Sequence, residues 1–237
     1  MTQERPVSDW RRTAAGRLAR PSSAAALLLG MAAAVVATAR AGAPEAGIAL
    51  AFVIIMAVLW LRAQRLADLG LRTPDSWART FLTALSVGVG AQLVSVLLIN
   101  PIIERFSGAP ADLSAFEPLR GDLQALLTLL AFVWVVVVFV EEIVFRGFFI
   151  TELRRVLGPG RGMQLTCVAL PAILFGLAHW YQGISGMLST GLMGLLLGYL
   201  FLCTRLNLWL PILTHGFLNT AGLLLVYFDA DRFLELS

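Results

Sequence analysis

The chain has 237 residues, of which 58% are hydrophobic and 14% are charged, and its mean hydropathy is +0.80. This composition excludes an ordinary soluble domain. The net charge of +3 is not the signature of a nucleic-acid-binding protein, because the basic residues are distributed as membrane topology requires. We therefore expect no nucleic-acid partner and expect the lipid bilayer to be the protein's main surroundings.

Seven apolar runs are long enough to cross a hydrocarbon core of roughly 30 Å. They cover residues 22–39, 46–62, 80–100, 124–150, 163–181, 184–204 and 206–228. No segment between these runs is long enough to form a soluble domain. The sequence therefore predicts an all-α, polytopic bundle of transmembrane helices, with seven spans or at most eight, that forms one integral membrane domain over residues 1–237.

The basic residues predict the orientation of this bundle. All 18 of them are arginines, and cytoplasmic loops carry an excess of basic residues. Fourteen fall on one side: Arg5, Arg11, Arg12, Arg17, Arg20, Arg62, Arg65, Arg72, Arg79, Arg146, Arg154, Arg155, Arg161 and Arg205. Four fall on the other: Arg40, Arg105, Arg120 and Arg232. This predicts a plasma-membrane protein with a cytoplasmic, arginine-rich tail at residues 1–21 and an external C-terminus.

An alternative interpretation of the first apolar run is a cleaved signal peptide. Ala37-Thr38-Ala39 follows this short run and matches the small-residue pattern of a signal-peptidase site. The long arginine-rich leader and the short distance to the next run favour a retained helix. Cleavage would leave the orientation of the other spans unchanged.

Charged residues at membrane depth are the most informative feature of the chain. Glu141, Glu142 and Arg146 lie in the apolar run LLAFVWVVVVFVEEIVFRGFFI. Each charge at the centre of a span costs roughly 2.5–3.5 kcal/mol on insertion scales, so such residues indicate a functional site. Arg146 follows Glu142 by four residues, the spacing of a salt bridge on one helix face. Glu141 then faces the bundle interior, where a poorly hydrated carboxylate suits a general base.

Both histidines of the chain also lie in apolar runs. Phe175 and His179 are four residues apart in one run, and His215 and Asn219 are four residues apart in another. A carboxylate and an imidazole can activate a water molecule, and an imidazole with an amide can stabilise an oxyanion. Glu141, His179 and His215 are also a possible ligand set for a divalent metal such as zinc. The residue pattern leaves the need for a metal open.

The order of the three motifs resembles a known family. Glu141-Glu142-x-x-x-Arg146, Phe175-x-x-x-His179 and His215-x-x-x-Asn219 on successive apolar runs are similar to the CPBP family, which comprises CAAX prenyl proteases and bacteriocin-processing enzymes and is also called Abi. The resemblance covers the predicted catalytic core, residues 123–224, and Leu69-Gly70-Leu71-Arg72 resembles another family segment. Structurally described relatives resemble an eight-helix bundle.

The resemblance implies an intramembrane endopeptidase, labelled either a metalloprotease or a glutamate-dependent protease. Glu141 and His179 would activate the water, and His215 and Asn219 would form the oxyanion site. Glu142, Arg146 and Phe175 would support them. The substrate would be a membrane-associated peptide or protein, such as a lipidated CAAX sequence or a leader peptide.

Helix rise gives an expected depth for each group. At 1.5 Å per residue, Glu141 lies roughly 18–20 Å and His215 about 15 Å from the cytoplasmic arginines. His179 lies about 27 Å away if its helix begins directly after Arg161, so a shared site requires a later start, a tilt or a bend at Pro171. We expect all four catalytic candidates to line one cavity that opens in the cytoplasmic half of the bilayer.

Two alternative functions are open. A transporter or an immunity protein could use Glu141 and the histidines as a proton relay, although a relay has no need of the His215 and Asn219 pair. A rhomboid-like serine protease could use Ser185 in Gly183-Ile184-Ser185-Gly186 with a histidine base. The serine protease would leave the Glu141, Glu142 and Arg146 group without a role.

Overall fold

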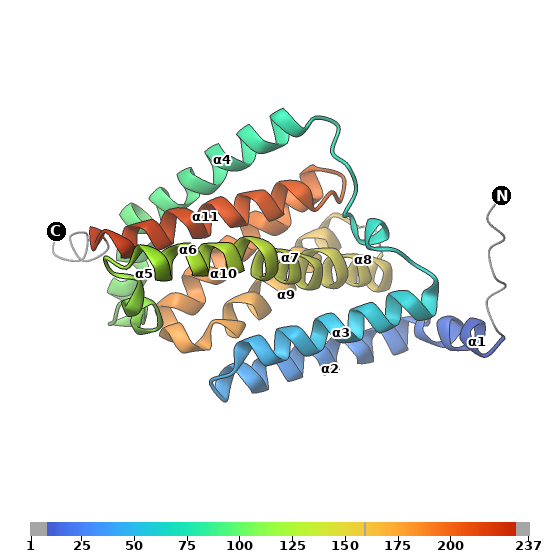
Figure 1. Cartoon of the computed structure of the whole chain (residues 1–237). Coiled ribbons are helices and arrows are strands. Elements are labelled where there is room, and N and C mark those ends of the chain that lie inside the picture. The colour runs from blue at the N-terminus through green and yellow to red at the C-terminus, as the bar shows by residue number, and fades with distance from the viewer. Residues whose placement is uncertain (1–8, 159, 231–237) are drawn as a thin grey trace.

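The computed structural model describes residues 9–158 and 160–230, and all regular structure in these ranges is helical (Figure 1). Six helical spans in these ranges are long and apolar enough to cross a membrane: Pro21–Arg40, Pro44–Arg62, Trp77–Ser107, Leu123–Leu157, Trp180–Cys203 and Trp209–Tyr227. A seventh apolar helix, Gly162–Ala178, is shorter. The all-α class is thus confirmed, and six of the seven predicted spans meet the length expected of a membrane-crossing helix.

The chain order of the helices is simple, although three spans are composite. The N-terminal part contains α1 (Asp9–Leu18), α2 (Pro21–Arg40), α3 (Pro44–Arg62) and η1 (Leu66–Leu69). The third span joins α4 (Trp77–Val94), η2 (Ser95–Ile99) and α5 (Asn100–Ser107), and η3 (Ser114–Leu119) follows. The fourth joins α6 (Leu123–Phe132), η4 (Val133–Val137), α7 (Val138–Glu142), η5 (Ile143–Ile150) and α8 (Thr151–Leu157). The last helices are α9 (Arg161–Ala178), η6 (Trp180–Gln182), α10 (Gly183–Cys203) and α11 (Trp209–Tyr227).

Local sequence signals explain where several helices begin. Pro21 and Pro44 occupy the first turns of α2 and α3, where proline's missing N–H is not needed. The Asp122 carboxylate accepts a hydrogen bond from the Ala125 N–H at 2.9 Å and caps α6. Each cap satisfies or removes a backbone donor that would otherwise be unpaired near the membrane.

One end of the bundle gathers the arginine-rich segments. Arg62 at the end of α3 pairs with Glu152 of α8 at 2.6 Å, and its guanidinium also donates to the Leu18 carbonyl at 2.8 Å. Arg72 donates to the Arg205 carbonyl at 2.9 Å at the turn between α10 and α11. We call this the arginine-rich end.

The opposite end holds the segment between α5 and α6 and the end of α11. The Gly121 N–H donates to the Tyr227 carbonyl at 3.1 Å, and the Asp112 N–H donates to the Gln182 carbonyl at 3.0 Å. Arg120 pairs with Asp229 at 2.8 Å. The two ends of α9 therefore lie at opposite ends of the bundle, because it begins at Arg161 and is followed by η6, which contains Gln182.

The predicted cytoplasmic tail contains a docked helix. Residues 1–8 lie outside the described ranges, but α1 packs on the end of α3 (Figure 1). The rings of Trp10 and Trp60 are 5.8 Å apart, and the Arg11 guanidinium lies 4.8 Å from the Trp60 ring centre. The aromatic pair and the cation–π contact hold α1 at the arginine-rich end.

Arg146 does not belong among the arginines counted for the cytoplasmic side. Its side chain lies inside the bundle and is 1% exposed. The arginine asymmetry does not depend on it, since thirteen arginines of the cytoplasmic set remain against four. Arg232 of the smaller set lies outside the described ranges.

Close approaches at glycine let α10 and α4 pack against α9 and α11. A Cβ at Gly194 of α10 would lie 3.0 Å from the Ala172 Cα of α9, and one at Gly88 of α4 would lie 2.6 Å from the Thr214 carbonyl oxygen of α11. Small residues allow helix backbones to approach in this way in membranes. These contacts fix α9 and α11 beside their neighbours, and α9 and α11 carry His179 and His215.

The predicted orientation can be checked with reporter fusions. A reporter placed after Arg155 should be cytoplasmic, and one placed after Ser237 should be external, because the arginine-rich end stays in the cytoplasm. Alkaline phosphatase and green fluorescent protein fusions at these two positions measure the sidedness directly. A cytoplasmic C-terminus would show that the number of spans differs by one.

Candidate active site

In the fourth span, the acidic pair Glu141 and Glu142 lies between two π-helical segments. η4 and η5 are π-helical, and η5 begins directly after Glu142. All eight residues of η5 are buried. Single π turns inside α-helices occur often at functional sites, because they change where side chains point.

Glu142 joins two motifs. Its Oε1 accepts a hydrogen bond from Arg146 Nη1 at 2.8 Å and another from His215 Nδ1 at 2.8 Å. Glu142 is 0% exposed and Arg146 is 1% exposed. The Glu142–Arg146 pair is the one that their spacing predicts, whereas the contact with His215 was not foreseen. Glu142 thereby fixes the orientation of the His215 ring, as a carboxylate partner does for histidines in other sites.

Phe175 packs against three functional groups. The Arg146 guanidinium lies over its ring at 4.5 Å from the centre, within cation–π distance. The rings of His179 and His215 lie 4.9 Å and 5.8 Å from it in edge-to-face arrangements. One aromatic ring therefore packs against both histidines and Arg146.

His179 lies directly after the last residue of α9. Its Nδ1 donates a hydrogen bond to the Phe175 carbonyl oxygen at 2.8 Å. A carbonyl can only accept, so Nδ1 carries a proton and Nε2 of the neutral ring is left as an acceptor. The main-chain contact therefore sets which nitrogen of His179 can take up a proton.

Glu141 faces the second ring nitrogen of His215. The distance from Glu141 Oε2 to His215 Nε2 is 3.7 Å, and Glu141 is 7% exposed. His215 thus lies between two carboxylates, with Nδ1 on Glu142 and Nε2 towards Glu141. The nearest histidine ring contact of Glu141 is therefore with His215, whereas the family resemblance pairs Glu141 with His179.

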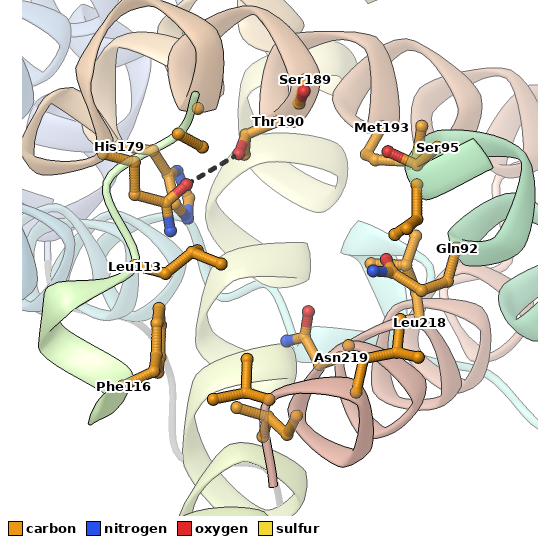
Figure 2. Close-up of a pocket in the computed structure, with 18 of the residues that line it drawn as sticks. Gln92, Ser95, Leu113, Phe116, His179, Ser189, Thr190, Met193, Leu218 and Asn219 are labelled. Carbon is orange, nitrogen blue, oxygen red and sulfur yellow. Dashed lines mark hydrogen bonds between the residues drawn. The ribbon is translucent and has the colours of Figure 1, made fainter. Parts of the chain in front are cut away.

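One cavity of about 410 Å³ contains all the predicted catalytic groups, and Figure 2 shows His179 and Asn219 on its wall. Its lining includes Glu141, Phe175, His179, His215 and Asn219. The Asn219 side chain points into the opening in Figure 2, and its amide makes no hydrogen bond with any described residue. The structure thus brings together the four groups that lie on three separate spans.

The cavity extends towards the end opposite the arginines. Its lining includes Ala111, Leu113 and Phe116 of the segment between α5 and α6, and Gln182 of η6. The predicted orientation and the expected opening in the cytoplasmic half of the bilayer therefore do not agree with each other in this arrangement. The physical reason is the position of His179: because α9 begins at Arg161, eighteen residues of helix rise separate His179 from the arginine-rich end.

The proposed metal ligands do not form a metal site. Within residues 9–158 and 160–230, no three side chains of His, Cys, Asp or Glu are grouped closely enough to hold an ion. His179 Nδ1 and His215 Nδ1 bind the Phe175 carbonyl and Glu142, which leaves the two Nε2 atoms and Glu141 as the atoms that would have to meet at an ion. The set of Glu141, His179 and His215 therefore does not fit a zinc ion as arranged.

The Ser185 hydroxyl is buried and hydrogen-bonded to residues near the end of α5. Its hydroxyl contacts the Ser107 hydroxyl at 2.6 Å and donates to the Ala109 carbonyl at 2.5 Å. The side chain is 3% exposed and has no hydrogen bond with either histidine. It ties the start of α10 to the end of α5, which contradicts the role of a serine nucleophile.

Several polar residues that line the cavity were not predicted from the sequence. Gln92, Ser95 and Asn100 belong to the third span, and Ser189 belongs to α10. They could have been found from their position in apolar runs, because amide and hydroxyl side chains there face protein or water rather than lipid. Because these four residues are uncharged and belong to no motif, the sequence does not distinguish them from ordinary polar groups between helices.

Comparison with known proteins agrees with the geometry. Residues 123–221 match the family model described as "Type II CAAX prenyl endopeptidase Rce1-like", and this segment contains all three motifs. No significant match was found among curated proteins or among solved structures. Members of the matched family are intramembrane endopeptidases that act on membrane proteins or peptides. In residues 123–221, the chain therefore carries a domain of the Rce1-like type II CAAX prenyl endopeptidase family, an integral membrane protease family.

Proposed function

We propose that this protein hydrolyses peptide bonds of membrane-associated peptides or proteins by direct attack of a water molecule. The observation that carries the proposal is the shared cavity of Glu141, His179, His215 and Asn219 inside an apolar bundle. Four polar groups at membrane depth are costly unless they serve one solvated site. Their chemical types cover the needs of amide hydrolysis without a covalent intermediate.

Glu141 is the proposed general base, assisted by His179. The attacking water gives its proton to the Glu141 carboxylate as its oxygen bonds to the scissile carbonyl carbon. His179 presents Nε2 as an acceptor because its Nδ1 is bound to the Phe175 carbonyl, so it can orient the same water. Glu141 then returns the proton to the leaving amine as the C–N bond breaks, which completes one balanced cycle of general acid–base catalysis.

His215 and Asn219 are the proposed donors to the oxyanion. His215 Nδ1 is bound to Glu142 at 2.8 Å, and Nε2 lies 3.7 Å from Glu141 Oε2, so the Nε2 edge of the ring is the one aimed at the proposed base. Asn219 adds an amide donor one turn along α11. Donors held in place before the reaction stabilise the developing negative charge without reorganisation.

The Asn219→Ala substitution tests the oxyanion role. Removing one such donor costs about 10²–10³-fold in kcat, whereas KM should change little because the charge develops only in the transition state. Steady-state kinetics with the purified protein in lipid vesicles separates the two constants. An increase in KM at unchanged kcat would instead show that Asn219 binds the ground-state substrate.

The substrate class is tested with purified protein in vesicles. The first probe is a fluorescent, farnesylated peptide that ends in Cys-aliphatic-aliphatic-X, and the second is an unlipidated leader-type peptide with an apolar segment. Release of a C-terminal fragment from the first probe supports CAAX-type processing, and internal cleavage of the second supports leader-type processing. Failure of wild-type protein to cleave either probe, with folding intact, would favour the proton-relay alternative.

A further inference from the structure

The cavity has a second polar wall away from the histidines. Gln92, Ser95 and Asn100 of the third span and Ser189 of α10 line it together with the catalytic groups. Figure 2 shows Gln92, Ser95 and Met193 across the opening from His179, with Asn219 between them on α11. None of these four polar residues has a part in the proposed water activation.

The side chain of Asn100 is oriented by hydrogen bonds to its oxygen, so its amide N–H groups remain as donors. Its Oδ1 accepts from the Ser95 hydroxyl at 3.1 Å and from the Ser189 hydroxyl at 2.7 Å. Both lone pairs of that oxygen are thereby used, and the Asn100 amide nitrogen has no partner among the described residues. The two serines orient the amide so that its N–H groups remain for a group inside the cavity.

The π turn of η2 makes this arrangement possible. The Asn100 N–H donates to the Ser95 carbonyl, five residues back, as a π-helical turn requires. Residues five apart then lie beside each other, which is why the Ser95 hydroxyl reaches the Asn100 side chain. Pro101, which follows, lacks an N–H and fits the first turn of α5.

Gln92 supplies a second unengaged amide. Its side chain lies beside α11, where a Cβ at Gly222 would be 3.2 Å from Gln92 Nε2. No described residue forms a hydrogen bond with the Gln92 amide. Gln92, Asn100 and Asn219 are thus three carboxamides around one cavity in an apolar bundle, each with donors to satisfy.

We propose that Gln92 and Asn100 bind the main chain of the substrate peptide within the catalytic cavity. A carboxamide and a peptide group have the same donor and acceptor, so an extended peptide satisfies both partners in a setting where an unpaired amide is costly. No described lining residue is an arginine, so the wall is suited to a neutral peptide segment rather than to an anionic group. This inference rests on the proposed peptidase function.

The test measures binding without turnover, in full-length protein that carries Glu141→Gln. The probe is the farnesylated Cys-aliphatic-aliphatic-X peptide, compared with the same peptide in which single amides are replaced by esters or N-methyl amides. Gln92→Met removes the amide at similar size, and Asn100→Asp keeps an oxygen for both serine hydroxyls while it removes the N–H donors. Gln124→Met, at an exposed position of α6, is the matched control.

Each lost neutral hydrogen bond should weaken binding of the unmodified peptide by about 2- to 12-fold, and the unfolding temperature of each variant is measured to separate a loss of binding from a loss of folding. At least one main-chain replacement should weaken binding to the parent protein and have little further effect on the Gln92→Met or Asn100→Asp variant. The Gln124→Met control should bind like the parent.

Three outcomes would overturn the inference: no binding of the probe to the parent, unchanged affinity in both variants, or equal losses from main-chain replacement in parent and variants. Failure of the peptidase function gives a different result, since wild-type protein would then bind the peptide with this pattern and not cleave it.

Discussion

Glu141→Gln should leave a folded protein whose turnover is about 10²–10⁴-fold lower, the range that a positioned general base contributes. The amide retains the size of the carboxylate and can still face His215, so the packing around the 3.7 Å contact changes little. Only the proton acceptor is lost. Peptide cleavage by purified protein in vesicles, together with the thermal unfolding midpoint, measures the two quantities separately.

The matched control is Glu45→Gln, which makes the same chemical change at an exposed position in the first turn of α3. It should retain full turnover. If Glu141→Gln also retained wild-type turnover at wild-type stability, Glu141 would have no part in the reaction, and the hydrolytic mechanism proposed for the cavity would be lost with it.

Arg146→Ala should be among the most destabilising single substitutions in the chain. Breaking a buried ion pair by removing one partner costs about 3–5 kcal/mol, because the remaining charge is left in a low-dielectric setting. Here Glu142 would keep only His215 as a partner, and the Phe175 ring would lose the guanidinium that lies 4.5 Å from its centre. Glu142→Gln should destabilise through the same pair, by leaving the Arg146 charge without its carboxylate.

Denaturant unfolding in mild detergent measures this loss, with Arg79→Ala as the control at an exposed position. The control should lie within about 0.5 kcal/mol of wild type, as exposed substitutions usually do. Full stability of Arg146→Ala would show that the Glu142–Arg146 pair contributes no net stabilisation, and Glu142 would then act only by orienting His215.

The sequence predicts the helices and the paired charges well because these depend on local patterns. Apolar length predicts the spans, and the four-residue spacing predicts the pairing of Glu142 with Arg146. The contact of His215 with Glu142 depends instead on the approach of α11 to α7, which no local pattern encodes. The count of Arg146 among the cytoplasmic arginines was wrong for a different reason: it used only the position of Arg146 near the end of the span, whereas the four-residue spacing already pairs this residue with Glu142.

The direction in which the cavity extends could be found only from the three-dimensional arrangement of the helices. Helix rise correctly placed His179 far from the arginine-rich end, but only the segment between α5 and α6 shows where the cavity leads, through Leu113 and Phe116. Asn100 could not be recognised from the sequence either, because its role depends on Ser189, which lies 89 residues away along the chain.

Mass spectrometry of peptide C-termini in cells that produce wild-type or Glu141→Ala protein tests the proteolytic function most directly. A membrane protease that depends on Glu141 predicts a set of C-termini, from membrane-associated proteins or peptides, that is present with wild type and lost with the variant at equal protein levels. The same set of C-termini in both samples would contradict proteolysis by this cavity.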